Sequence, residues 1–203
     1  MAKAGILYVG TSNGLVIYSD PGGSGRWRRV GMSLEGQPIE QIRATDALNL
    51  TLLSASVVLQ TSDGGQHWST SSDHTVLTMR TDAQPYVATA TGPVRWSVQY
   101  APMPNATALA LLAGDPELLI AALDAGRILA RSEDGGSTWR PGEVVGGLVG
   151  QIQTIEPSRY HMDLAWAGSD CGQLLRSHDR GQHWHTIARE PVPILCLAVV
   201  RLA

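Results

Sequence analysis

Short apolar runs separated by glycine, proline and polar residues extend along the whole chain. Most runs have about four to eight residues, which is the usual length of a strand and too short for most helices. No segment keeps an apolar period of about 3.6 residues between helix-capping residues. The pattern therefore predicts an all-β protein.

The runs recur in a fixed order, which predicts repeats of four strands, here called a to d. The a strands are expected at residues 39–45, 75–81, 106–113, 149–155 and 194–201. The b strands are expected at 6–11, 50–55, 86–91, 118–123 and 164–168. The c strands are expected at 15–19, 57–61, 94–98, 127–132 and 173–177.

An eight-residue signature follows three of the c strands, at residues 61–68, 132–139 and 177–184. Each copy reads Ser/Thr-x-Asp-x-Gly-x-x-Trp, and the d strand is expected to start at its tryptophan. Two further units carry a tryptophan without a regular signature. In the first, Asp20 is displaced and one residue is inserted before Trp27, and the unit around Trp96 has no signature at all.

The spacing of these features predicts five units in 203 residues. Their average length of about 41 residues suits a four-stranded blade of a β-propeller. The units are expected at 1–37 with 193–203, 38–72, 73–104, 105–147 and 148–192 of a single domain spanning 1–203.

The chain begins with a b strand and ends with an a strand, so neither end completes a blade alone. The C-terminal strand is therefore expected to complete the N-terminal blade and to close a ring of five blades. Such closure removes exposed sheet edges. Six blades are the alternative, if the stretch 86–105 contains more structure than its pattern indicates.

The signature resembles the Asp-box, or bacterial neuraminidase repeat, of β-propellers such as sortilin-type receptor domains and photosystem II assembly factors. Each residue of the signature also has a local task in a turn. The aspartate is expected to accept backbone N–H groups from one or two residues further along, the glycine to adopt a positive φ, and the tryptophan to pack between sheets. The first-position hydroxyl is expected to bond the opposite strand. These structural residues are Asp63, Gly65 and Trp68, then Ser132, Asp134, Gly136 and Trp139, then Asp179, Gly181 and Trp184.

Composition excludes several classes of function. A formal charge of −3 and a pI of about 6.0 argue against nucleic-acid binding. The apolar N-terminal stretch is too short for a membrane span or signal peptide. We expect a cytoplasmic monomer, or a secreted or periplasmic one if a leader has been removed. The histidines lack metal-ligand spacing, and no cofactor is expected. Cys171 and Cys196 leave one disulfide possible.

Resemblance to Asp-box proteins raises the question of glycosidase activity. A sialidase would use an arginine triad and a Tyr-Glu pair, and here Arg43, Arg80 and Arg201 occupy similar places near the ends of a strands. A glycosidase needs two carboxyl groups about 5–10 Å apart. Asp124 and Asp170, on equivalent b–c turns of adjacent units, are the best such pair. Asn13 occupies the same turn in the first unit, which favours an ordinary turn role.

A binding module is the preferred hypothesis. The d–a loops at 31–37, 101–105 and 142–147 differ in length and carry the apolar residues Met32, Leu34, Met103 and Val145. Together these would suit a partner surface. The sequence thus predicts a non-enzymatic scaffold that binds a protein or a carbohydrate through its loop face, with Asn13, Asp124, Asp170, Arg43 and Arg80 as candidate binding residues. The alternative is a glycoside hydrolase that uses Asp124 and Asp170.

Overall fold

The computed structural model describes residues 4–71, 87–89, 92–94, 106–112 and 117–202. The chain divides into two compact units, which are described separately. Unit 1 consists of Met1–Asp82 with Val192–Ala203, and unit 2 consists of Ala83–Pro191. The described residues contain strands and turns but no helix, which confirms the predicted all-β class.

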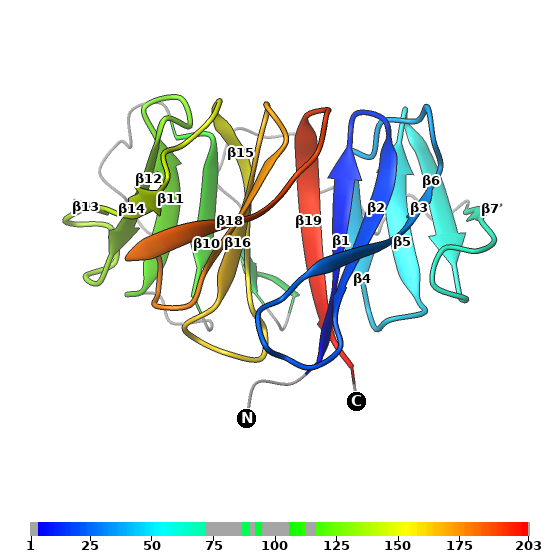
Figure 1. Ribbon diagram of the computed structural model, residues 1–203, viewed down its shortest axis with the longest axis horizontal. Helices are drawn as coiled ribbons and strands as arrows, with labels where there is room; N and C mark the ends of the chain where they lie inside the picture. Colours follow the sequence, from blue (N-terminus) through cyan, green and yellow to red (C-terminus); the bar gives the residue numbers. More distant parts are fainter. Residues whose placement is uncertain (1–3, 72–86, 90–91, 95–105, 113–116, 203) are drawn as a thin grey trace. The chain divides into compact units, whose positions relative to one another are not determined.

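The first sheet of unit 1 joins the two ends of the chain. Its strand order is β19-β1-β2-β3. The bounds are β1 Gly5–Thr11, β2 Gly14–Asp20, β3 Arg28–Ser33 and β19 Ile194–Arg201. The red β19 lies beside the blue β1 in Figure 1, and their antiparallel register places Leu7 opposite Val199. The predicted pairing of the C-terminal strand with the N-terminal blade is therefore present.

The second sheet of unit 1 has the order β4-β5-β6-β7, which follows the chain. Its strands are β4 Gln41–Ala44, β5 Leu50–Ser54, β6 Val57–Thr61 and β7 Ser69–Thr70. Residues of both sheets form one core, in which Tyr8, Leu15 and Leu52 are buried. The Tyr8 hydroxyl donates to the carbonyl oxygen of Ala47 at 2.6 Å, and burial raises the pKa of Tyr8 to about 12.

Unit 2 contains a four-stranded antiparallel sheet of order β10-β11-β12-β13. Its strands are β10 Ala108–Leu111, β11 Leu119–Leu123, β12 Ile128–Ser132 and β13 Arg140–Pro141. The same unit contains the pair β8 Val87–Thr89 and β9 Gly92–Val94. These two short strands lie within the expected third repeat; its a strand at 75–81, Trp96 and Met103 lie outside the described residues.

The last sheet has five strands in the order β14-β18-β17-β16-β15. Four of them are the expected antiparallel blade: β15 Ile152–Pro157, β16 Ala165–Ser169, β17 Gln173–Ser177 and β18 His183–Arg189. The fifth, β14 Glu143–Val145, pairs in parallel with the outer edge of β18, so that Val144 lies opposite Trp184. We expected residues 142–147 to be a loop, and that expectation is wrong for 143–145.

The core of unit 2 lies between its two large sheets. Ile120, Leu175 and Trp184 are among its fully buried side chains. Each fully buried side chain of this kind contributes roughly 2 kcal/mol to the free energy of unfolding. Gly181 lies directly against Ile120, so the third signature turn is packed on the neighbouring sheet.

The strand predictions agree with the structure in most places and differ at the ends of the d strands. β3, β7 and β13 start just after their tryptophans, whereas β18 starts one residue before Trp184. Met32 lies in β3 rather than in a d–a loop, and Leu34 packs on the core of unit 1. The predicted apolar loop patch therefore loses both residues.

The five blades and the closed ring stay predictions, as does the single domain. The described residues form no helix, and they therefore contain no helical segment that could cross a membrane.

Candidate functional site

The first residue of each signature holds its turn from inside. Ser132 Oγ donates to Asp134 Oδ1 at 2.7 Å and accepts the N–H of Gly136 at 2.8 Å. Thr61 and Ser177 make the same two contacts in their own turns. We expected this hydroxyl to reach the opposite strand. Instead it bonds within its own turn, in which the fifth-position glycine has the positive φ that its type favours.

The signature aspartates accept backbone N–H groups from four residues further along. The distances are 3.0 Å from His67 to Asp63, 2.8 Å from Thr138 to Asp134 and 2.9 Å from His183 to Asp179. The expected range of one or two residues was too short.

These contacts keep the aspartates ionised. The side-chain and backbone hydrogen bonds of Thr138 lower the pKa of Asp134 to about 2. The His67 N–H is the main cause of a lowered pKa at Asp63. Partial burial opposes the shift at Asp179, but hydrogen bonds from His183 and Ser177 still leave its pKa below the usual value. Carboxylates held in this way are poor proton donors near neutral pH.

The tryptophans close the turns. Trp68 Nε1 donates to the carbonyl oxygen of Gly65 at 3.1 Å, and Trp184 Nε1 donates to that of Gly181 at 3.2 Å. Trp139 packs against the cluster of Leu111 and Leu119.

The first blade uses a different residue for the same purpose. Asp20 lies opposite Gly5 at the end of its c strand, as Thr61 lies opposite Leu50. Its carboxylate accepts the N–H groups of Ser24 at 3.0 Å and Gly25 at 2.6 Å. Asp20 thus occupies the serine/threonine position, and counting from the c strand rather than from the tryptophan would have found it.

The three polar residues of the b–c turns are in different environments. Asn13 Oδ1 accepts the N–H of Gly36 at 3.1 Å. Asp170 Oδ1 accepts the N–H of Gln151 at 2.7 Å, and its hydrogen bond to the Cys171 thiol raises the pKa of that thiol. Asp124 is exposed at a φ of 51°, and no described residue hydrogen-bonds its carboxylate. No hydrogen bond within the described residues links Asp124 to Asp170.

Two of the three candidate arginines lie within the described residues, on different strands. Arg43 is exposed on β4 opposite Thr51, and Arg201 ends β19 opposite Gly5. Arg80 lies outside the described residues.

Asp170 instead lies beside the loop 146–150, which connects β14 to β15. Fully buried Gln173 anchors this loop: Val149 N–H donates to its Oε1 at 2.7 Å, and its Nε2 donates to the Gly147 carbonyl at 3.1 Å. Val149 in this loop and Val145, the last residue of β14, are 40% and 43% exposed. The backbone of the loop is therefore held by hydrogen bonds while the two valines face solvent.

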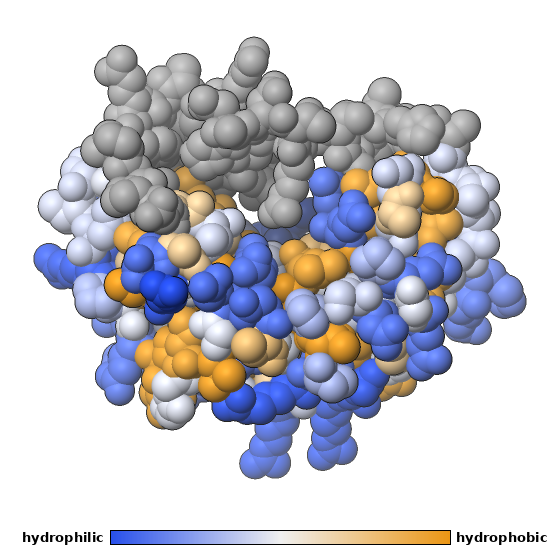
Figure 2. All heavy atoms as spheres, turned by 90° about the horizontal axis from the view of Figure 1, so that it is seen from above, coloured by the Kyte–Doolittle hydropathy of each residue, from blue (hydrophilic) through white to orange (hydrophobic). Residues whose placement is uncertain are grey.

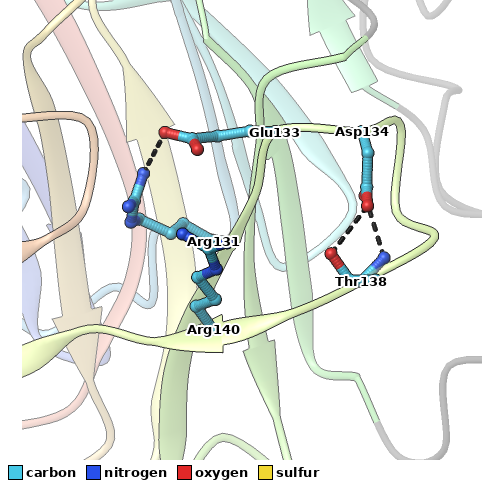
Figure 3. Close-up of a pocket in the computed structure, with 5 residues that line it drawn as sticks. All are labelled: Arg131, Glu133, Asp134, Thr138 and Arg140. Carbon is cyan, nitrogen blue, oxygen red and sulfur yellow. Dashed lines mark hydrogen bonds and ion pairs between the residues drawn. The ribbon is translucent and has the colours of Figure 1, made fainter.

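A second site, absent from the sequence predictions, lies on the c–d turn of the β10–β13 sheet. Arg131 on β12 and Arg140 on β13 are direct cross-strand neighbours. Together with Glu133, Asp134 and Thr138 they line a pocket of about 200 Å³. Figure 3 shows Arg131 paired with Glu133, while Asp134 is bound by Thr138. This site could have been found from the register, because the residue before each signature faces the residue after its tryptophan.

The equivalent positions carry other residues in the other two signatures. Gln60 faces Ser69 in unit 1, in a pocket of about 470 Å³ that also includes His67 and Trp68. Arg176 faces His185 in the last sheet, where the rings of His178 and His185 are stacked 5.7 Å apart. The turn is constant, and the chemistry of the adjacent surface varies from blade to blade.

The described residues show no group of three histidine, cysteine or acidic side chains that could hold a metal ion. Cys171 is exposed and Cys196 is buried, and both are free thiols, so the disulfide left open by the sequence is not formed.

The chain matches no protein-family profile and no curated protein sequence. Among solved structures, it is similar to a GH74 xyloglucanase from Xanthomonas campestris at 16% identity and a TM-score of 0.35, covering 91% of this chain and 28% of that one. It is also similar to YCF48 from Cyanidioschyzon merolae at 15% identity and a TM-score of 0.37, covering 89% and 66%. A Nidogen/Laminin complex matches at 11% identity and a TM-score of 0.35, covering 94% and 64%. Similarity this low assigns neither an activity nor a partner to this chain.

Proposed function

We propose that this protein is a non-enzymatic β-propeller scaffold that binds a protein partner through its loop face. The observation that carries the proposal is the exposure of Val149 in the loop 146–150 and of Val145 at the end of β14, both on backbone held by hydrogen bonds. Carbohydrate is the other class of ligand that the sequence leaves open, and the proposal prefers protein because exposed aliphatic side chains suit an apolar partner surface.

Preorganisation favours binding by this loop. Ordering a flexible loop costs free energy that would be subtracted from the affinity. Here the amide of Gln173 holds the loop through two hydrogen bonds before any partner arrives. Covering the two valines would then contribute roughly 1–2 kcal/mol each.

The surface supports a small contact of this kind. On the face seen in Figure 2, the apolar side chains of the described residues form separate groups with polar residues between them. Large continuous apolar patches mark extensive interfaces. A limited anchor of a few side chains fits this surface better.

Hydrolysis by Asp124 and Asp170 is the alternative function, and the geometry favours it less. The Asp170 carboxylate is occupied by Gln151 and Cys171. The signature aspartates are ionised and bound inside their turns. A glycosidase needs one carboxyl group that can donate a proton to the leaving group.

The test compares partner retention by the wild type and by a Val145→Lys/Val149→Lys variant. Immobilised protein is exposed to a cell lysate, and bound proteins are quantified by mass spectrometry. We expect specific partners to fall at least about tenfold for the double variant, because two apolar contacts are lost. Val57→Lys is the matched control, since Val57 is 45% exposed on β6.

Equal retention by all three proteins would contradict the proposed surface. A parallel screen uses xyloglucan oligosaccharides and sialosides as substrates. Turnover that is abolished by Asp124→Asn would overturn the non-enzymatic proposal in favour of the hydrolase.

A further inference from the structure

The pocket between β12 and β13 contains positive charge that its own residues only partly neutralise. Arg140 is exposed, and no described residue forms a hydrogen bond or ion pair with its guanidinium. Asp134 lines the same pocket, but its oxygens are occupied by Ser132 and Thr138. Arg140 is therefore available to a group from outside the pocket.

The Arg131 side chain forms part of the pocket wall, whereas its partner Glu133 faces solvent. The side chain of Arg131 is 14% exposed, whereas that of Glu133 is 50% exposed. The two form an ion pair through one guanidinium nitrogen and one carboxylate oxygen. Because the arginine is fixed and the glutamate is at the surface, another carboxylate could replace Glu133 without rearrangement of the strand.

A third arginine, Arg180, adds positive charge near Glu133. Ion pairing with Arg131, and the further charges of Arg140 and Arg180, lower the pKa of Glu133. Arg180 itself is bound to Asp163, with 2.7 Å between Nε and Oδ1. Three guanidinium groups thus favour a negative charge at the position where Glu133 now lies.

We propose that this pocket binds a carboxylate of an acidic peptide segment, with Arg131 and Arg140 as its ligands and Glu133 as an internal competitor. This inference rests on the proposed protein-binding function and names the chemistry of one contact. A peptide is favoured because the group that now occupies Arg131 is itself a glutamate side chain. The pocket therefore already accommodates the geometry of a glutamate carboxylate, and arginine is well suited to bind it.

The experiment measures binding of a fluorescent acetylated hexaglutamate peptide by anisotropy at low ionic strength, where screening is weak. Arg140→Gln should weaken binding about tenfold, because it removes one charge-assisted contact. Glu133→Gln should strengthen binding several-fold, because it removes the competitor. Arg28→Gln is the matched control, since Arg28 is also an exposed arginine that directly follows a blade tryptophan on a strand, and it should bind as the wild type does.

The opposite effects of two neighbouring substitutions separate binding from misfolding. Thermal melting of each variant checks that the fold is kept. The proposal is overturned if Glu133→Gln fails to strengthen binding, if Arg140→Gln binds as the wild type does, or if hexaglutamine peptide binds equally well. It is also overturned if a heparin hexasaccharide binds with this arginine dependence while hexaglutamate does not.

The result is independent of the loop experiment. Failure of the peptide to bind, together with loss of partners from Val145→Lys/Val149→Lys, would leave the proposed function intact and remove only this inference. Peptide binding with no partner lost from the loop variant would place the functional surface at the signature turn instead.

Discussion

Asp20 takes the place in β2 that Thr61 takes in β6, and each closes the following turn through an oxygen at the same position of the strand. The hydroxyl of Thr61 accepts the N–H groups of Asp63 and Gly65, and the carboxylate of Asp20 accepts those of Ser24 and Gly25. The irregular first turn is therefore closed in the same way as the signature turns, by a side-chain oxygen that accepts backbone N–H groups, but from an aspartate instead of a serine or threonine.

Asp20→Ala should destabilise the first blade. The substitution leaves the N–H groups of Ser24 and Gly25 without their acceptor, and Asp20 is only 4% exposed. We expect the free energy of unfolding in urea to fall by about 1–3 kcal/mol. Glu35→Ala, at an exposed position, is the control and should change it by less than about 0.5 kcal/mol. A loss for Asp20→Ala no larger than that of the control would contradict this role.

The signature turns should make stability depend on pH in acid. Hydrogen bonds from Thr138 and Ser132 give Asp134 a folded-state pKa of about 2, below the usual value of 3.8. A lowered pKa contributes stability that is present above pH 4 and is lost as the pH falls toward 2. The melting temperature should therefore fall less steeply between pH 4 and pH 2 in Asp134→Asn than in the wild type. Ser137→Ala, a neutral change in the same turn, should keep the wild-type slope.

Arg180 occupies a backbone conformation that glycine would adopt more easily. Its φ is 60°, and the residues at the same position of the other signatures are Gly64 and Gly135. Arg180→Gly and Arg180→Ala both remove the ion pair with Asp163, so their difference reports the backbone alone. We expect the glycine variant to be more stable than the alanine variant by roughly 1 kcal/mol in chemical denaturation. Equal stabilities would show that this turn carries no backbone strain.

Gln173 should control the order of the loop 146–150. Gln173→Leu replaces the amide with an apolar side chain of similar size and leaves the Val149 N–H and the Gly147 carbonyl without their partner. Amide exchange at Val149 should accelerate, and the free energy of unfolding should fall by roughly 2–4 kcal/mol. Gln60→Leu changes a glutamine that is not fully buried and should leave exchange in this loop unchanged. Unchanged exchange in Gln173→Leu would mean that the loop is ordered by other contacts.

The strands that the sequence predicts correctly are those whose burial follows the apolar pattern. Leu119 to Ala122 and Leu174 with Leu175 are almost fully buried, so the run of apolar residues and the strand coincide. The pairing of the chain ends also follows from the predicted order of strands. The first b strand has no a strand before it, and the last a strand has no b strand after it, so these two strands are expected to pair with each other.

β14 could not be predicted in this way. Residues 143–145 lie between glycines and read as a loop, and their partner His183–His185 is far along the chain. Parallel pairing of this kind depends on tertiary placement rather than on local pattern. The arginine pocket differs in this respect, because the register of the signature turn places Arg131 beside Arg140 and could have been applied to the sequence.

The antiparallel contact between β1 and β19 has a consequence for synthesis of the protein. Residues 5–11 leave the ribosome long before their partner strand, which ends at Arg201. The nascent chain must therefore hold β1 without β19 until residues 194–201 have been translated. Because such distant pairings form slowly, this step is expected to limit the folding rate of the first sheet, and a chain interrupted before residue 194 would expose the apolar edge of β1 to other molecules.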